Sequence, residues 1–447
     1  MNKCRKSVFK YKNYAHFDSK KKPVSFENKI KNRDWVARHG FYPFIHYKIK
    51  FNKYVYKEGY GKYSRQKKSK KRDIYYSSHI DRYIYQYYAN ELNHYYNQYA
   101  KSIGINKASI AYRNELKGKC NIDFSKEVID FIVKTEEAFI YIADFTSFFD
   151  GLDHKYLKEK ICTILGCTSL PKEHYSIYKS ITNFTYIEKN DILKYKQIKN
   201  RDFNQLEIIF DNPKEFREFK SKFLKKHKDT YKGRKGMGIP QGSSISAVYS
   251  NIYMIDFDKK INDYVTSNNG IYRRYCDDII IVLPLKCESE SYKHHVEKIN
   301  EIKEETDNLI INDDKTSKYI YKEGTILDID DNSESFLDYL GFSFDGKAVK
   351  LREKSLFKFY SRMNKKIKIS NIYSDKYKRK VFRKRMYKLY SHLGASNKSG
   401  YGNFLTYAYK SYNIFGEDNV YKNMIRKQVK KHWKVMNKKL IKIERNK

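Results

Sequence analysis

Two adjacent acidic residues, Asp277 and Asp278, stand directly before an apolar run, Ile279 to Leu283. With Arg273 to Cys276 before them, this run predicts a buried β-hairpin whose turn carries both carboxylates. Removing two neighbouring like charges from water is costly, and a hard divalent cation resolves the conflict because carboxylate oxygens are its preferred ligands. The pattern therefore predicts a Mg²⁺ site on a sheet and favours phosphoryl or nucleotidyl transfer.

The charge of the chain indicates a polyanionic partner. Its 447 residues include 92 Lys and Arg but 52 Asp and Glu, for a net charge of +40. Compositional drift can explain Lys in place of Arg but not so large an unpaired excess, so nucleic acid is favoured. A membrane partner is disfavoured because no signal peptide, lipidation motif or membrane-spanning apolar stretch is evident. The cysteines form no C-x-x-C pair, which is typical of free thiols in a reducing cytoplasm.

A third acidic residue ends another predicted strand. Residues 138–145 are apolar, β-branched and aromatic, which predicts a buried strand, and Asp144 lies near its end. If this strand neighbours the hairpin, Asp144, Asp277 and Asp278 converge at one sheet edge and could hold two ions about 4 Å apart. One ion would activate an attacking hydroxyl, and the other would steady a triphosphate and its leaving pyrophosphate. A single strand-end acid is usually a solvated loop residue, but acids from separate segments favour the metal site.

A tight turn and a helix lie between these segments. Gly238, Pro240 and Gly242 predict a turn with exposed backbone N–H groups, and Gln241 within it can donate and accept hydrogen bonds. A helix is predicted from Ser243 to about Asp258. The alternative interpretation is an ordinary loop with a serine helix cap.

Other elements are predicted from periodicity and charge. The expected helices cover 81–99, 289–309, 362–368, 376–393 and 420–439, and short strands are expected near 318–323 and 335–344. The charge run 64–72 predicts a solvated loop. The region after Leu351 interleaves Lys and Arg with Tyr, which suits phosphates and sugars.

Five motifs in a fixed order resemble those of bacterial reverse transcriptases, closest to the group II intron, retron and stand-alone, defence-associated lineages. These motifs are residues 143–150, the Pro-Gln-Gly segment 238–251, the Tyr-x-Asp-Asp box 275–278, the acidic-Lys-Thr segment 312–316 and the primer-grip segment 336–344. Two fingers motifs are matched in part, by Lys71-Arg72 with Asp81-Arg82 and by Tyr112-Arg113, and a structural role is the alternative for Arg113. The tetrapeptide alone would be weak evidence.

The resemblance implies a role for each matching residue. Asp144 and Asp277 would be the principal ligands of two Mg²⁺ ions, with Asp278 in support. The backbone around Phe145 would contact the metal-bound triphosphate. The other implied contacts are Lys71 and Arg72 for the triphosphate, Phe149, Gln241 and Gly242 for the nucleotide pocket, Tyr339, Leu340 and Gly341 for the primer, and Lys315 as proton donor to pyrophosphate.

Two of these roles have plain alternatives. Phe149 matches the position of a ring that clashes with a ribose 2′-hydroxyl, but it could pack in the core as Phe148 does. Lys315 could be a solvated surface lysine.

The departures from the family bear on the lineage. No Asn-Ala-x-x-His pattern lies between the first two palm motifs, and no Val-Thr-Gly follows the primer grip, which disfavours a retron enzyme. Little chain follows the expected thumb, which disfavours a complete intron protein. The resemblance thus implies a cytoplasmic enzyme of antiphage defence with a dedicated noncoding RNA as template. The alternatives are a template-independent or RNA-synthesising polymerase, and a non-catalytic RNA-binding or splicing cofactor.

The implied fold class is α+β, a right-hand polymerase with fingers, an antiparallel-sheet palm and a basic helical thumb. The expected divisions are a basic N-terminal extension (1–60), fingers (61–137), palm (138–154), a fingers or insertion segment (155–236), palm (237–348) and thumb (349–447). Expected partners are an RNA template, its cDNA product and deoxynucleoside triphosphates.

Overall fold

The computed structural model of the chain describes residues 9–56, 65–116, 118–285, 292–305, 309, 311, 315–394, 402–417 and 420–441. Its centre is a five-stranded antiparallel sheet in the order β11-β10-β3-β9-β8. The strands are β3 (Glu137–Asp144), β8 (Ile271–Tyr275), β9 (Asp278–Pro284), β10 (Ser317–Lys322) and β11 (Thr325–Asp328). The predicted strand at 138–145, the hairpin around 275–278 and the strand near 318–323 are confirmed.

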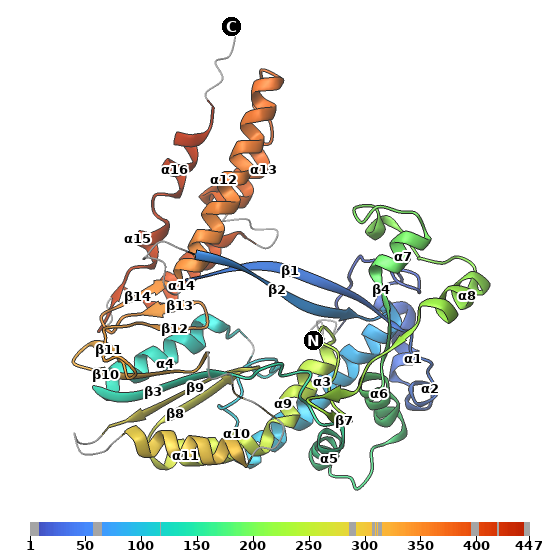
Figure 1. The fold of residues 1–447 in the computed structure, drawn as a ribbon, viewed down its shortest axis with the longest axis horizontal. Coiled ribbons are helices and arrows are strands. Elements are labelled where there is room, and N and C mark those ends of the chain that lie inside the picture. Colours follow the sequence, from blue (N-terminus) through green and yellow to red (C-terminus); the bar gives the residue numbers. More distant parts are fainter. Residues whose placement is uncertain are drawn as a thin grey trace, which may run out of the picture.

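Alternating side chains of the central strands feed two separate cores. Phe139, Tyr141 and Ile281 pack with helices on one face of the sheet, while Ile140 and Ile280 pack on the other. Figure 1 shows α4 (Asn121–Thr135) on one side of the sheet and α10 (Ile255–Ser267) and α11 (Tyr292–Glu304) on the opposite side. Burial on both faces holds the strand ends, and the acids they carry, in a fixed register.

Some predicted helices form with changed limits, and others are wrong. The helix expected at 362–368 is part of a longer one over 353–376, and the α-helix expected at 376–393 is reduced to 383–390. The single helix expected at 420–439 is wrong, because a short strand at 422–423 and two separate helices, 425–429 and 432–439, take its place.

The helix at 81–99 is α3 (His79–Ser102), and the helix at 289–309 is the shorter α11. The single helix expected from Ser243 to Asp258 is wrong, because it is divided at Met254 into α9 (Ser244–Tyr253) and α10. The division lets α10 turn beneath the sheet, where Phe257 and Ile261 join the core.

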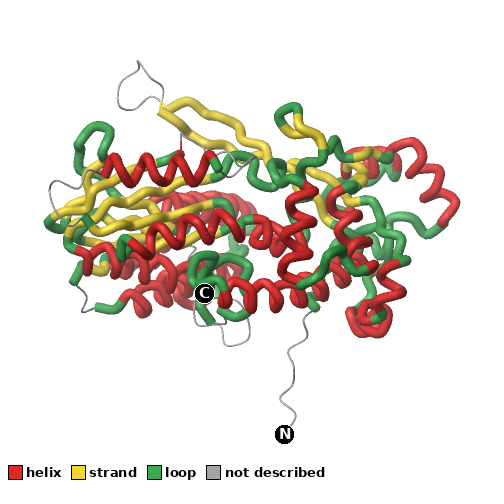
Figure 2. The backbone as a smooth tube through the Cα atoms, turned by 90° about the horizontal axis from the view of Figure 1, so that it is seen from below, coloured by secondary structure: helices red, strands yellow, loops and turns green. Residues whose placement is uncertain are grey.

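The charge run predicted as a loop is a strand. β2 (Arg65–Tyr76) pairs with β1 (Phe44–Tyr56) in a long antiparallel hairpin, which Figure 2 shows projecting along the edge of the molecule. Cross-strand hydrogen bonding satisfies the backbone although Tyr47 to Phe51 stay exposed, and this pairing cannot be read from charge. The expected boundary between 1–60 and 61–137 falls within this hairpin, so strands on both sides of it share one sheet.

Helices and short strands surround the base of the hairpin. β1 also pairs with β4, giving a sheet in the order β2-β1-β4-β5. The surrounding elements are η1 (Pro23–Phe26), α1 (Glu27–Lys31), α2 (Arg33–Ala37), α5 (His154–Leu165), α6 (Lys172–Thr182), β4 (Thr185–Glu188), α7 (Lys189–Tyr195), η2 (Phe203–Gln205), α8 (Pro213–Phe223), β5 (Lys225–Lys226), β6 (Thr230–Tyr231) and β7 (Arg234–Lys235).

A small sheet and a helical region complete the fold. The sheet has the order β12-β13-β14-β15, from β12 (Leu337–Tyr339), β13 (Phe342–Phe344), β14 (Ala348–Leu351) and β15 (Lys422–Asn423). The helices are α12 (Glu353–Lys376), α13 (Arg383–Tyr390), η4 (His392–Gly394), α14 (Phe404–Phe415), α15 (Ile425–Val429) and α16 (His432–Lys439). In Figure 1, α12, α13 and α16 rise away from the central sheet. No helix among the described residues is long and apolar enough to span a membrane.

Candidate active site

The three predicted acids meet at one end of the central sheet. β3 and β9 pair antiparallel with Asp144 opposite Asp278, so the last residue of one strand faces the first residue of the other. The backbone N–H of Phe145 donates to the Asp277 carbonyl at 3.2 Å, which ties the two segments together beyond the ladder. Cys276 holds the turn with a φ of 62°, a left-handed conformation that places Asp277 and Asp278 side by side.

The electrostatics of this cluster are those of uncompensated negative charge. Burial and then repulsion by Asp144 raise the pKa of Asp277. Asp278 retains exposed surface, yet loss of hydration and then repulsion by Asp277 and Asp144 raise its pKa to about 6. The ammonium group of Lys315 forms an ion pair with Asp144 Oδ2, while Asp144 Oδ1 is buried with no hydrogen-bond partner among the residues that the structure describes.

This donor set suits a hard cation. The orphaned oxygen of Asp144 and the raised pKa values of its neighbours both record charge that a divalent ion would neutralise. Within the described ranges, no three His, Cys, Asp or Glu side chains are already arranged around a common point as metal ligands.

A fully buried ion pair supports the turn that carries Asp277 and Asp278. Arg274 donates to both oxygens of Asp258, at 2.8 and 2.6 Å, and both side chains are 0% exposed. The same guanidinium donates to the Cys276 carbonyl at 3.0 Å and to Asn251 Oδ1 at 3.2 Å. Tyr272 donates its hydroxyl proton to Asp258 at 2.7 Å. Arg274 thus links the turn to α9 and α10. This role was not predicted from the sequence. The signal was available, because a charged residue in an apolar hairpin indicates a buried partner of opposite charge.

Phe149, Gln241 and Gly242 line one cavity of about 390 Å³. Neighbouring Phe148 is buried in the core, whereas Phe149 is only partly buried and reaches the cavity, so the geometry separates the two rings. The backbone N–H of Ile239 donates to the Phe149 carbonyl at 2.9 Å, which joins the Pro-Gln-Gly turn to the segment after Asp144.

The Pro-Gln-Gly turn also touches the long hairpin. The Tyr75 N–H donates to the Gln241 carbonyl at 3.1 Å. Gly242 has a φ of 127°, and a Cβ there would lie 2.5 Å from the Tyr75 carbonyl oxygen, so only glycine fits. Ile74 lies on the side of β2 that faces Gly242, and Arg72 shares that side because alternate residues of a strand point the same way. Lys71 lies on the opposite side.

The predicted primer-grip residues form the β12–β13 turn. Leu340 and Gly341 have φ values of 45° and 97°, and Tyr339 is buried. Asn121 of α4 donates to the Leu340 carbonyl at 2.8 Å, and the Arg352 N–H donates to the Gly341 carbonyl at 3.0 Å. These bonds fix the turn to the rest of the fold.

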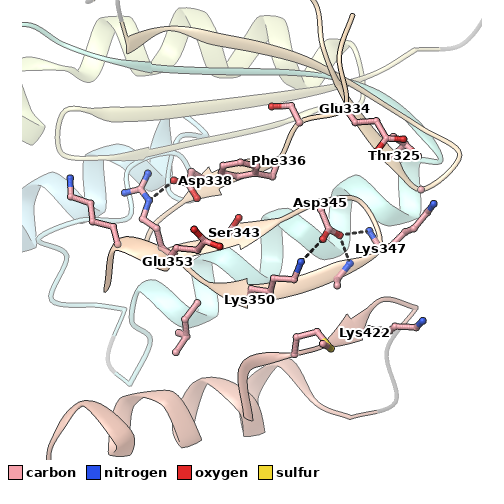
Figure 3. Close-up of a pocket in the computed structure, with 17 residues that line it drawn as sticks. Thr325, Glu334, Phe336, Asp338, Ser343, Asp345, Lys347, Lys350, Glu353 and Lys422 are labelled. Atoms are coloured by element: carbon pink, nitrogen blue, oxygen red, sulfur yellow. Dashed lines mark hydrogen bonds and ion pairs between the residues drawn. The ribbon is translucent and has the colours of Figure 1, made fainter. Parts of the chain in front are cut away.

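A cavity of about 1010 Å³ lies beside this turn. Figure 3 shows Asp338, Ser343 and Lys350 projecting into it from one face of the small sheet. Asp338 accepts from Arg352 Nε at 2.6 Å, and Asp345 accepts from Lys350 at 2.7 Å. Acids and bases are mixed here, unlike the acid cluster at the end of the central sheet.

The remaining predicted residues have mixed outcomes. Arg113 is structural, with bonds to Asn97, Asn106 and the Ser109 carbonyl. Of the acidic-Lys-Thr segment, Lys315 reaches Asp144, whereas residues 312–314 lie outside the described part of the chain.

Comparisons with known proteins identify the family to which most of the chain is similar. Residues 65–344 match the family model described as reverse transcriptase (RNA-dependent DNA polymerase). No curated protein matches the chain. Among solved structures, an apo telomerase from Candida tropicalis truncated from its C-terminal domain is 14% identical, covering 66% of this chain and 52% of that one, with a TM-score of 0.40. A Candida albicans telomerase in complex with a telomeric RNA fragment is 12% identical, covering 90% and 64%, with a TM-score of 0.39. The chain spans about half the length of the first of these.

Proposed function

The chain belongs to the reverse transcriptase family and is an RNA-directed DNA polymerase with a right-hand fold, and from this premise we propose that Asp144, Asp277 and Asp278 form its catalytic centre. The observation that carries the proposal is the register of β3 against β9, which sets Asp144 opposite Asp278. Two Mg²⁺ ions held by these carboxylates would lower the pKa of the primer 3′-hydroxyl and neutralise charge on the triphosphate.

The chain's own residues position the substrates. Asp144 and Asp277 would be the main metal ligands, and the backbone at Phe145 would contact the triphosphate. Phe149 closes the pocket beneath the sugar and excludes a 2′-hydroxyl, which its place on the cavity wall supports. Lys315 would give a proton to leaving pyrophosphate, a role that its ion pair with Asp144 supports by placing its ammonium group at the acid cluster.

The other predicted contacts extend this pocket. Gln241 and Gly242 form the wall next to Phe149, and Arg72 approaches the triphosphate from β2 as a planar fork of donors. Lys71, on the outer side of the hairpin, contributes positive potential rather than a direct bond. The turn of Tyr339, Leu340 and Gly341 holds the primer terminus.

The domain divisions follow from these roles. Residues 138–154 and 237–348 form the palm, 61–137 and 155–236 form fingers, and 349–447 form a basic thumb. The pairing of β1 with β2 supports adding 44–56 to the fingers. The partners are an RNA template and its cDNA, and the basic thumb is suited to an RNA–DNA duplex.

The lineage that the motifs resemble most supports a more specific role. We propose that the enzyme copies a dedicated noncoding RNA in the cytoplasm of a bacterium, as part of antiphage defence. Its template would be found among RNAs that co-purify with it, so sequencing RNA and DNA recovered with the protein should return one abundant RNA and its complement. An Asp277→Ala, Asp278→Ala variant should keep the RNA, lose the DNA and lose protection in a phage challenge.

Two outcomes favour the rival functions. Full protection by the double variant would identify a non-catalytic RNA-binding or splicing cofactor. DNA without complementarity to any bound RNA would identify template-independent synthesis.

A further inference from the structure

The N-terminal segment 10–22 is fastened to the start of α3. Tyr14 donates its hydroxyl proton to the Ser77 carbonyl at 2.9 Å, and its ring stacks on His79 with centroids 4.7 Å apart. The Asp18 carboxylate accepts from the backbone N–H groups of His79 and Ile80, each at 2.9 Å. A side chain far away in sequence thus caps α3, which fixes the segment in place.

This segment supplies one wall of the cavity that Phe149 lines. Lys12 and Tyr14 come from the segment, Arg82 from α3, and Ser243 and Ser244 from the start of α9. The lining includes no Asp or Glu. The cavity therefore joins two cations and a helix N-terminus without a neutralising acid.

Three residues that line this cavity carry a buried donor for which the described part of the chain offers no hydrogen-bond acceptor. Arg82 is 8% exposed, and one of its terminal nitrogens, Nη2, donates to the Lys10 carbonyl. The guanidinium also interacts with the Tyr14 side chain, but Nη1 is buried without a hydrogen bond among the described residues, as are the hydroxyl oxygens of Ser243 and Ser244. Buried donors are normally satisfied, so three of them around one cavity indicate a ligand that accepts hydrogen bonds.

Charge defines the ligand further. The pKa of Lys12 is lowered by burial first and then by repulsion from Arg82 and Lys10, as expected of crowded cations. The first turn of α9 holds no acidic residue and adds the positive end of its dipole. An anion with several acceptor oxygens satisfies all of these groups together.

We propose that Lys12, Arg82 and the start of α9 form a pocket for one phosphate group, completed by the N-terminal segment. The phosphate belongs either to the backbone of a bound nucleic acid strand or to a free nucleotide. The pocket is the part of the proposed nucleotide cavity that lies toward the N-terminal segment, since Phe149, Gln241 and Gly242 line the same cavity, and its use in the reaction rests on the proposed function. The anion site itself rests only on the unpaired donors.

The test compares Lys12→Gln with Lys22→Gln. Both lysines are exposed and lie on the same segment, but only Lys12 lines the cavity. We expect Lys12→Gln to weaken binding of an RNA-overhang template–primer about fivefold and to lower the slope of log affinity against log salt by about 0.9, as loss of one phosphate contact does. Lys22→Gln removes the same charge away from the cavity and should stay near wild type.

Two binding measurements, neither requiring catalysis, distinguish the sources of the phosphate. Affinity is measured for the overhang complex and, on a chain-terminated primer, for a deoxynucleoside triphosphate. If Lys12→Gln weakens binding of the overhang complex, the pocket holds a phosphate of the nucleic acid strand. If Lys12→Gln weakens binding of the deoxynucleoside triphosphate alone, the pocket holds a nucleotide phosphate. If Lys12→Gln matches Lys22→Gln in both measurements, the pocket is overturned. Failure of the proposed function would appear separately, as wild-type protein that binds but never extends a primer.

Discussion

Replacing Arg274 with Met tests how the catalytic turn is held. The substitution removes two hydrogen bonds to Asp258 and one each to Asn251 and the Cys276 carbonyl, and it leaves Asp258 charged, fully buried and bonded to Tyr272 alone. Breaking a buried ion pair from one side costs about 3–5 kcal/mol. We expect the free energy of unfolding, measured by urea denaturation, to fall by that amount.

The double variant Arg274→Met, Asp258→Leu separates stability from catalysis. Removing both charges eliminates the unpaired carboxylate, so stability should return to within about 1–2 kcal/mol of wild type, the remainder being the unpaired Tyr272 hydroxyl. Primer extension should stay about hundredfold low, because the Cys276 carbonyl still lacks its donor and displacement of the turn by about 1 Å is enough for that loss. If the single variant costs under about 1 kcal/mol, or the double variant regains full activity, Arg274 does not position the turn.

Three further predictions test the pocket and the acid cluster. Phe149→Ala should admit ribonucleotides and lower discrimination against them at least about tenfold in competitive incorporation, because the ring that meets the 2′-hydroxyl is gone; a wild-type enzyme that already prefers ribonucleotides would contradict this. Gly242→Ala should reduce primer extension strongly, because its Cβ would collide with the Tyr75 carbonyl, 2.5 Å away, and displace the Gln241 contact; unchanged kinetics would show that the turn is free to move. The pKa of Asp278 is raised to about 6, so the folded state holds its proton more tightly than the unfolded state, and the metal-free protein should lose stability as pH rises from about 4 to about 6. Asp278→Asn should flatten this slope in urea titrations, and an unchanged slope would refute the assignment.

The sequence predicted the central sheet better than the long outer hairpin and the helix boundaries. The strands of Asp144 and of Asp277–Asp278 are apolar runs that end in acids, so local pattern and tertiary placement agree there. The hairpin of β1 and β2 was not predicted, because residues 64–72 are a charge run without alternation. Residues 47–52 do alternate apolar and polar side chains, but Tyr47, Ile49 and Phe51 stay exposed, so no buried face marks this part of the strand. The division of one predicted helix at Met254 was equally hidden, because both halves share the same apolar period.

Site residues could be predicted where the chemistry requires a particular residue type. Residues that hold the site in place through contacts between distant segments could not be predicted. Asp144 and Asp277 could be named from charge at strand ends. The partnership of Arg274 with Asp258 depends on how α10 packs beneath β8, and the unpaired donors around Arg82 depend on a segment about 70 residues earlier. Such pairings appear only once the chain is folded.

The most direct test of the central claim is primer extension on a heteropolymeric RNA template with deoxynucleotides and Mg²⁺, for wild type and Asp277→Asn. The wild type should make DNA complementary to the template, and Asp277→Asn should reduce the rate at least about a thousandfold while RNA affinity and unfolding free energy stay close to wild type. Template-directed synthesis that survives in Asp277→Asn would contradict the assignment of the three carboxylates.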